Sequence, residues 1–90
     1  MIKLKEKKIL CDYEYHTEGI LAGGMITLDE NKFIKILQGI IYGKENEMKR
    51  IGIFTWNIEN NSFDMIKTEN QELVSNIISD ILVEIKKEGL

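Results

Sequence analysis

The sequence predicts a small α+β domain of ββαββα order, in which two helices pack on one face of a four-stranded, mainly antiparallel sheet. Apolar residues alternate in several segments, which predicts strands, and recur every three or four residues in two others, which predicts helices. The 90 residues suffice for one small core, so we expect a single domain over residues 1–90. Its two ββα halves are predicted at about residues 9–43 and 50–89.

The first half begins with a predicted hairpin. "ILCDYEYH" alternates two sets of side chains, Cys11, Tyr13 and Tyr15 on one side and Asp12, Glu14 and His16 on the other. This alternation is typical of a half-buried strand. "TEG" at residues 17–19 predicts a turn, and the second strand is predicted from Ile20 to about Leu28.

A helix is predicted over the next segment, "DENKFIKILQGIIYG". Asp29 is the predicted N-cap and Gly43 the predicted stop. Between them the apolar residues recur at intervals of three and four: Phe33, Ile36, Leu37, Ile40 and Ile41.

The second half repeats this order. "RIGIFTWNI" predicts a strand, "ENN" a turn and "SFDMIK" a returning strand. The following "TENQ", Thr68 to Gln71, has the spacing of a capping box. A wide apolar stripe then predicts a helix that ends before Gly89: Leu73, Val74, Ile77, Ile78, Ile81, Leu82 and Ile85.

Charge and composition narrow the classes of function. The net charge is −3, but residues 1–8 hold four lysines and one glutamate, so they form a basic edge or flexible start on an acidic body. An acidic body repels phosphate backbones, so we do not expect nucleic acid as the partner. With one cysteine, no signal-like start and no long apolar run, the sequence predicts a cytoplasmic protein. The excess of isoleucine and lysine is typical of AT-rich bacterial or phage genes.

The adjacent glycines Gly23 and Gly24 allow two interpretations. A glycine-rich phosphate loop needs free backbone N–H groups at a helix start, but Asp29 and Glu30 already occupy the predicted start. A bulge or close backbone approach within a strand is therefore favoured. A small-molecule or nucleotide pocket at these glycines, shared between two protomers, is the alternative.

No set of residues predicts catalysis. Cys11 and His16 lie about 16 Å apart along one strand and leave it by opposite faces. Asp12, Glu14 and His16 share a face and define a second alternative, a metal-dependent enzyme. A solvated strand face explains the same alternation. We therefore expect no enzyme, no metal and no cofactor.

The strongest functional signal is apolarity on both sides of two strands. Phe54, Trp56 and Ile58 share one side of the third predicted strand, and Leu21 and Met25 share one parity of the second. A bulge at Gly23 and Gly24 would reverse that parity midway, so the sequence leaves open which of Leu21 and Met25 faces outward. Two helices cover one face of a sheet, so we expect these five residues to form an interface with another protein or a second copy. The rival interpretation is that the helices and the basic start cover more of the sheet.

The sequence thus predicts a non-enzymatic protein–protein interaction module. Small acidic proteins from AT-rich genomes include phage and mobile-element inhibitors of host defence proteins, and an inhibitor is the narrower expectation by that association.

Overall fold

The computed structural model describes residues 1–7, 9–43 and 49–89 of the chain. Six strands precede one C-terminal helix: β1 (Ile2–Lys7), β2 (Leu10–Thr17), β3 (Ile20–Leu28), β4 (Ile34–Gly43), β5 (Lys49–Asn57), β6 (Ser62–Thr68) and α1 (Gln71–Lys87).

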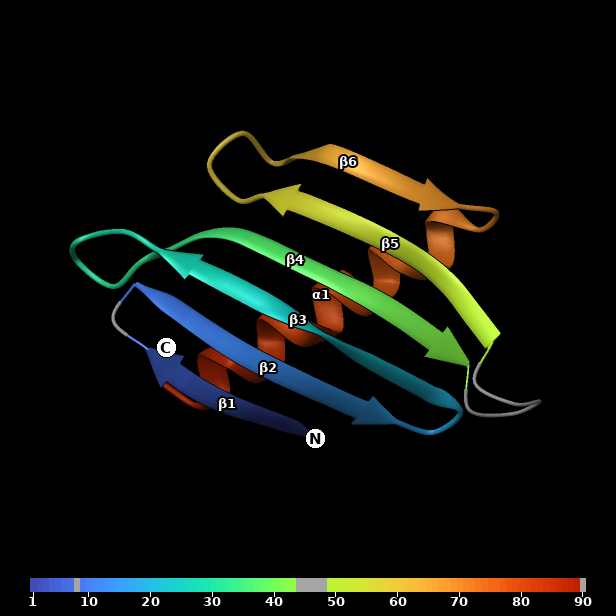
Figure 1. Cartoon of the computed structure of the whole chain (residues 1–90), viewed down its shortest axis with the longest axis horizontal. Coiled ribbons are helices and arrows are strands. Elements are labelled where there is room, and N and C mark those ends of the chain that lie inside the picture. Colours follow the sequence, from blue (N-terminus) through green and yellow to red (C-terminus); the bar gives the residue numbers. More distant parts are fainter. Residues whose placement is uncertain (8, 44–48, 90) are drawn as a thin grey trace.

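The predicted ββαββα fold is wrong. The structure has one six-stranded antiparallel sheet in the order β1-β2-β3-β4-β5-β6, and α1 is the one helix of the described residues. Every strand pairs with the next one along the chain, so the sheet is a meander. The molecule has two layers, because α1 runs diagonally behind the sheet from the β5–β6 side to β1 (Figure 1).

Four predicted strands are present, as β2, β3, β5 and β6. The turn between β2 and β3 has two residues, Glu18 and Gly19, because Thr17 pairs with Ile20. Gly19 has a φ of 76°, a conformation that glycine adopts without steric cost. The predicted "TEG" turn is thus one residue too long at its start.

The helix predicted over residues 29–43 is instead a loop followed by β4. Asp29 does cap backbone N–H groups, but it caps a turn: its Oδ1 accepts hydrogen bonds from the N–H of Asn31 at 2.8 Å and of Phe33 at 2.9 Å. Lys32 within this turn has a φ of 68°. Aspartate caps turns and helices by the same side-chain bond, so the cap signal is ambiguous.

β4 was mistaken for a helix because both of its sides are apolar. Leu37 and Ile41 face α1, whereas Ile36 and Ile40 face away from it. Two such neighbouring pairs, four residues apart, reproduce the spacing of an amphipathic helix. The branched isoleucines and the internal glycine of "IKILQGIIYG" favour a strand, and the sheet context decides the outcome.

The basic start contains β1, which pairs with β2 at one edge of the sheet. Ile2 is buried and Leu4 packs against the core, while Lys3 alternates with them on the other side. Lys8, which belongs to the predicted basic start, lies outside the described residues. Residues 9–43 therefore supply three strands, and the two halves of the chain are not both ββα units.

The predicted C-terminal helix is confirmed as α1. Its N-cap is Asn70, whose side chain accepts a hydrogen bond from the N–H of Leu73. Thr68, the predicted cap, instead donates to the carbonyl of Ile51 and accepts from the N–H of Asn70. The helix buries one stripe against the sheet: Val74, Ile77, Ile78, Ile81 and Ile85.

One row of residues across the sheet shows how the two layers fit together. Tyr13, Gly24, Gly39 and Phe54 lie side by side on β2, β3, β4 and β5. A side chain on Gly24 would overlap the β4 backbone, and one on Gly39 would overlap the Tyr13 hydroxyl and the Phe54 ring. The two glycines therefore leave the space in which the two aromatic rings lie beneath α1.

Candidate functional site

The face of the sheet opposite α1 is the candidate site, and we call it the open face. Antiparallel partners point to the same side, so the pairings define it row by row. One row crosses all six strands with Lys3, Glu14, Gly23, Ile40, Ile53 and Lys67. The next row is Lys5, Asp12, Met25, Gln38, Thr55 and Met65.

The middle strands of the open face carry apolar side chains together with the uncharged polar side chains of Gln38 and Thr55. Met25 is 37% exposed and Met65 39% exposed. Around them lie half-buried apolar side chains from three strands: Leu21 on β3, Ile36, Ile40 and Tyr42 on β4, and Ile53 on β5. Within the described residues no second helix covers them, so they lie uncovered on one face, with Gln38 and Thr55 between Met25 and Met65. Uncovered apolar side chains of this kind are typical of binding sites.

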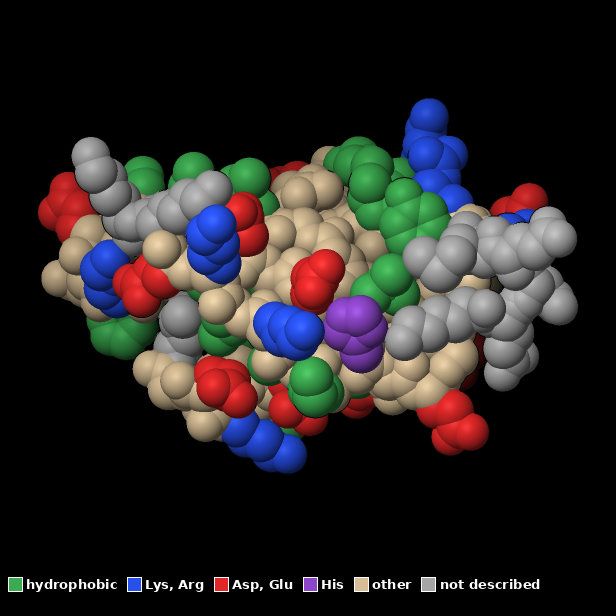
Figure 2. Space-filling model, turned by 60° about the horizontal axis from the view of Figure 1, so that its bottom comes forward, with side chains coloured by type: hydrophobic (Ala, Val, Ile, Leu, Met, Phe, Trp, Pro, Cys, Tyr) green, Lys and Arg blue, Asp and Glu red, His purple; other side chains and the backbone are tan. Residues whose placement is uncertain are grey.

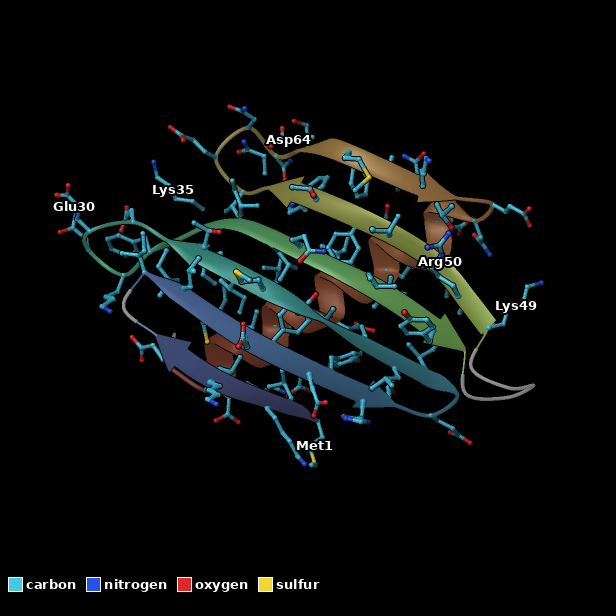
Figure 3. The ribbon with its side chains drawn as sticks, in the orientation of Figure 1. Met1, Glu30, Lys35, Lys49, Arg50 and Asp64 are labelled. Carbon is cyan, nitrogen blue, oxygen red and sulfur yellow. The ribbon has the colours of Figure 1, made fainter. Side chains whose placement is uncertain are left out.

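Charged side chains flank this apolar surface. On β1 and β2, lysines stand opposite carboxylates, with Lys3 across from Glu14 and Lys5 across from Asp12. Figure 2 shows charged side chains and a histidine in the foreground, with hydrophobic side chains gathered beyond them. On the other flank, Arg50 reaches from the start of β5 toward the end of β6 (Figure 3).

The two edges of the sheet are poorly suited to adding a further strand. β1 carries lysines at alternate positions, Lys3 and Lys5, which discourage pairing with another chain. On β6, Asp64 is an extra residue between Met65 and Phe63, which pair with Thr55 and Trp56. A bulge of this kind twists an edge and interrupts its hydrogen-bonding pattern. Binding is therefore better supported by the open face than by either edge.

The structure separates the five predicted interface residues into two groups. Leu21 and Met25 lie on the open face. Phe54 is fully buried, and Trp56 stacks edge-on against Phe63 with ring centroids 4.7 Å apart, beside α1.

Ile58 also lies on the α1 side, because it shares a hollow with Leu82 and Lys86. Phe54, Trp56 and Ile58 therefore belong to the layer between sheet and helix. Sequence reasoning missed Ile36, Ile40, Ile53 and Met65, which complete the open face. The signal for the first two was present, since β4 read as a strand places them on one side.

The paired glycines also lie on opposite faces. Gly24 lies against the β4 backbone on the covered face, which confirms the close approach. The bulge predicted here is absent, since the register of β3 with β4 shifts only between Thr27 and Leu28. Gly23 lies on the open face, where a Cβ atom would make an ordinary contact with the Tyr13 carbonyl. Gly23 thus leaves a shallow point in the open face.

A concavity of about 700 Å³ opens far from these glycines, where β5 begins and β6 ends. Lys49, Arg50 and Thr68 are among its lining residues. This concavity is distinct from the pocket that the small-molecule interpretation places at Gly23 and Gly24 between two protomers.

Asp12, Glu14 and His16 share the open face, as their alternation predicts. His16 Nε2 lies 3.7 Å from a carboxylate oxygen of Glu14, within range of an ion pair when the imidazole is protonated. In the described ranges no three histidine, cysteine or acidic side chains are placed to hold one metal ion. These residues belong to the charged flank of the open face.

The nucleophilic side chains of β2 lie in the core instead. Cys11 is fully buried, and burial raises the pKa of its thiol, which disfavours the reactive thiolate. Burial likewise raises the pKa of the Tyr13 phenol well above its usual range. The Tyr13 hydroxyl has no hydrogen-bond partner among the described residues.

Neither a family model, nor a curated protein, nor a solved structure matches this chain. α1, within the described part of the chain, lacks the length and apolarity that crossing a membrane would require.

Proposed function

We propose that this chain is a non-enzymatic protein-interaction module that binds a protein surface through the open face. The observation that supports this proposal most strongly is the group of apolar side chains that β3, β4 and β5 present in the middle of that face, opposite the helix. A sheet whose second face only met water would carry polar side chains there, as β2 does with Asp12 and Glu14.

The shape and size of the open face favour a protein over a small molecule. The molecule measures 40 × 24 × 18 Å, and the sheet lies across the two longer dimensions (Figure 1). A standard protein–protein interface covers about 800 Å² on each partner, and the open face is broad enough to supply it. Small-molecule sites are concave. A hollow of about 270 Å³ on the open face is lined by charged residues such as Lys5 and Asp12, away from the apolar side chains of β3, β4 and β5. An inhibitor of a host protein would use the same face, and that narrower role stays a prediction.

A matched pair of substitutions tests the proposal. Ile40→Lys places a charge in the middle of the open face, whereas Val83→Lys places one on the outer side of α1, where Val83 is already 53% exposed. Tagged versions of both variants and the native chain are captured from the source cells. Every bound protein, including untagged copies of the chain, is then quantified.

We expect Ile40→Lys to lose the proteins that the native chain retains, and Val83→Lys to keep them, because only the first charge would be desolvated at the interface. Circular dichroism checks that both variants are folded. If the two variants retain the same proteins as the native chain, the open face is not the binding site and the proposal fails.

A further inference from the structure

We propose that the protein on the open face is a second copy of this chain, related to the first by a two-fold axis that runs along β4. This inference rests on the proposed function and names the partner. With β4 on the axis, β3 of one copy lies over β5 of the other, and β2 lies over β6. β1 then lies outside the contact.

The middle of the open face meets the first requirement of a two-fold contact. Strands on the axis meet their own copies, so a charge there would face an identical charge. On the open face β4 presents Ile36, Gln38, Ile40 and Tyr42, none of which is charged. Ile40 would pack against Ile40 of the second copy.

The strands beside β4 are complementary in shape. Gly23 on β3 and Ile53 on β5 both lie in the row of Ile40, one strand to either side. The two-fold axis therefore places Ile53 of each copy over Gly23 of the other. The Ile53 side chain would fill the space above Gly23, whereas two large side chains facing each other at this position would overlap.

The outer strands are complementary in charge in one row, whereas in the next row Asp12 of each copy would lie over Met65 of the other. Glu14 on β2 and Lys67 on β6 lie in this same row, each two strands from β4. The axis brings Glu14 of each copy over Lys67 of the other, which gives two ion pairs per dimer. No ion pair within the described residues joins Lys67 to a carboxylate of its own chain.

The geometry is that of an ordinary β-sandwich. Two sheets that pack face to face lie about 10 Å apart with their strands inclined by roughly 30°. Long side chains such as glutamate and lysine reach across that distance at the periphery of the contact. Lys3 and Lys5 on β1 stay in solvent and offer control positions.

The experiment reverses the two charges separately and together. Glu14→Lys, Lys67→Glu and the double variant Glu14→Lys/Lys67→Glu are compared with the native chain by sedimentation equilibrium and native mass spectrometry. Val83→Lys on the outer side of α1 is the control that changes charge away from the open face, and Lys3→Glu measures the effect of a charge reversal beside Glu14 but outside the contact. Both Glu14 and Lys67 are exposed, so folding should be preserved, and circular dichroism checks it.

We expect the native chain and Lys3→Glu to dimerise, and each single reversal to weaken the dimer by about tenfold or more, because like charges then face each other twice. Two results distinguish this arrangement from any other. A mixture of the two single variants should form a 1:1 heterodimer, and the double variant should recover the homodimer.

Two outcomes would overturn the inference. One is a native chain that stays monomeric at about 100 µM, where even weak dimers form. The other is a dimer that tolerates both reversals. In either case the proposed function still stands if Ile40→Lys loses another bound protein that Val83→Lys keeps, and it fails as well if neither variant changes binding.

Discussion

The two faces of the sheet use neighbouring residues for different purposes. On the covered face, the row of Tyr13, Gly24, Gly39 and Phe54 fits beneath α1 with no space for an added side chain at either glycine. On the open face, the adjacent row has half-buried isoleucines and a glycine with room above it. The comparison teaches that residue type alone does not show how tightly a position is packed, because Gly23 and Gly24 are neighbours in the sequence and lie on different faces.

Truncating a large side chain on each face should give the largest difference. Phe54→Ala should lower the free energy of unfolding by about 3–5 kcal/mol, because it leaves a cavity in the core. Ile53→Ala should lower it by only about 1 kcal/mol, because that side chain is half-buried with nothing over it in the monomer. Urea denaturation of dilute protein measures both. Equal losses would show that the open face is as closely packed as the covered one.

The glycine pair provides the second test. Gly24→Ala should destabilise the fold by roughly 3 kcal/mol, because its methyl group would meet backbone that cannot move aside easily. Gly23→Ala should change stability by less than about 1 kcal/mol, because its methyl group makes an ordinary contact. Thermal unfolding of both variants checks the difference, and similar values for the two would contradict the assignment of faces.

Removing the hydroxyl of Tyr13 should stabilise the protein. An unpartnered buried polar group costs about 1–3 kcal/mol, so Tyr13→Phe should raise the free energy of unfolding by up to that amount. Tyr15→Phe on the same strand provides a comparison. A loss of stability in Tyr13→Phe would reveal a hydrogen bond that the hydroxyl makes in the folded protein.

The same tyrosine predicts a dependence on pH. Burial raises the pKa of Tyr13 in the folded protein, whereas in the unfolded chain the phenol ionises at about pH 10. The contribution of the neutral Tyr13 phenol to the free energy of unfolding is therefore fully present below about pH 10, and it is lost as the pH rises toward the pKa of Tyr13 in the folded protein. Stability should fall in alkali, and the fall should be smaller in Tyr13→Phe. Part of it should remain, because burial also raises the pKa of Tyr15.

The smallest predicted effect concerns the helix that makes the covered face. Asn70→Ala should lower stability by about 1 kcal/mol, because the N–H of Leu73 loses its acceptor. Asn76→Ala, at an exposed position within α1, should be neutral or slightly stabilising. Chemical denaturation compares the two, and an equal effect at both positions would argue against Asn70 as the cap.

The sequence predicted β2 and α1 because each has a single buried side, which gives a clear period. It predicted β3, β5 and β6 because the turn signals "TEG" and "ENN" join them to neighbouring strands. β4 has apolar residues on both sides, and its paired isoleucines imitate a helix. For β1 the sequence predicts only a basic edge or flexible start, although Ile2 and Leu4 alternate with lysines. Strand pairing supplies the missing information, because β4 is stabilised by neighbours on both sides that no local pattern shows.

The candidate site was half predictable. The apolar residues on both sides of β3 indicated Leu21 and Met25, and the structure places both on the open face. Which side of β5 the helix covers cannot be read from alternation, so Phe54 and Trp56 were assigned to the interface instead of Ile53. Reading residues 34–43 as a helix removed Ile36 and Ile40 from the sheet altogether.

Methionine oxidation tests most directly the central claim that the open face is a binding surface. Met25 and Met65 both lie on the open face. Met1, which is 69% exposed and lies at the lower edge of the sheet, is the control (Figure 3). The protein is oxidised briefly over a range of concentrations, and each methionine is quantified by mass spectrometry. If the open face closes against a second copy, oxidation of Met25 and Met65 falls as the concentration rises while that of Met1 stays constant. If the oxidation of Met1, Met25 and Met65 does not change with protein concentration, the account is contradicted.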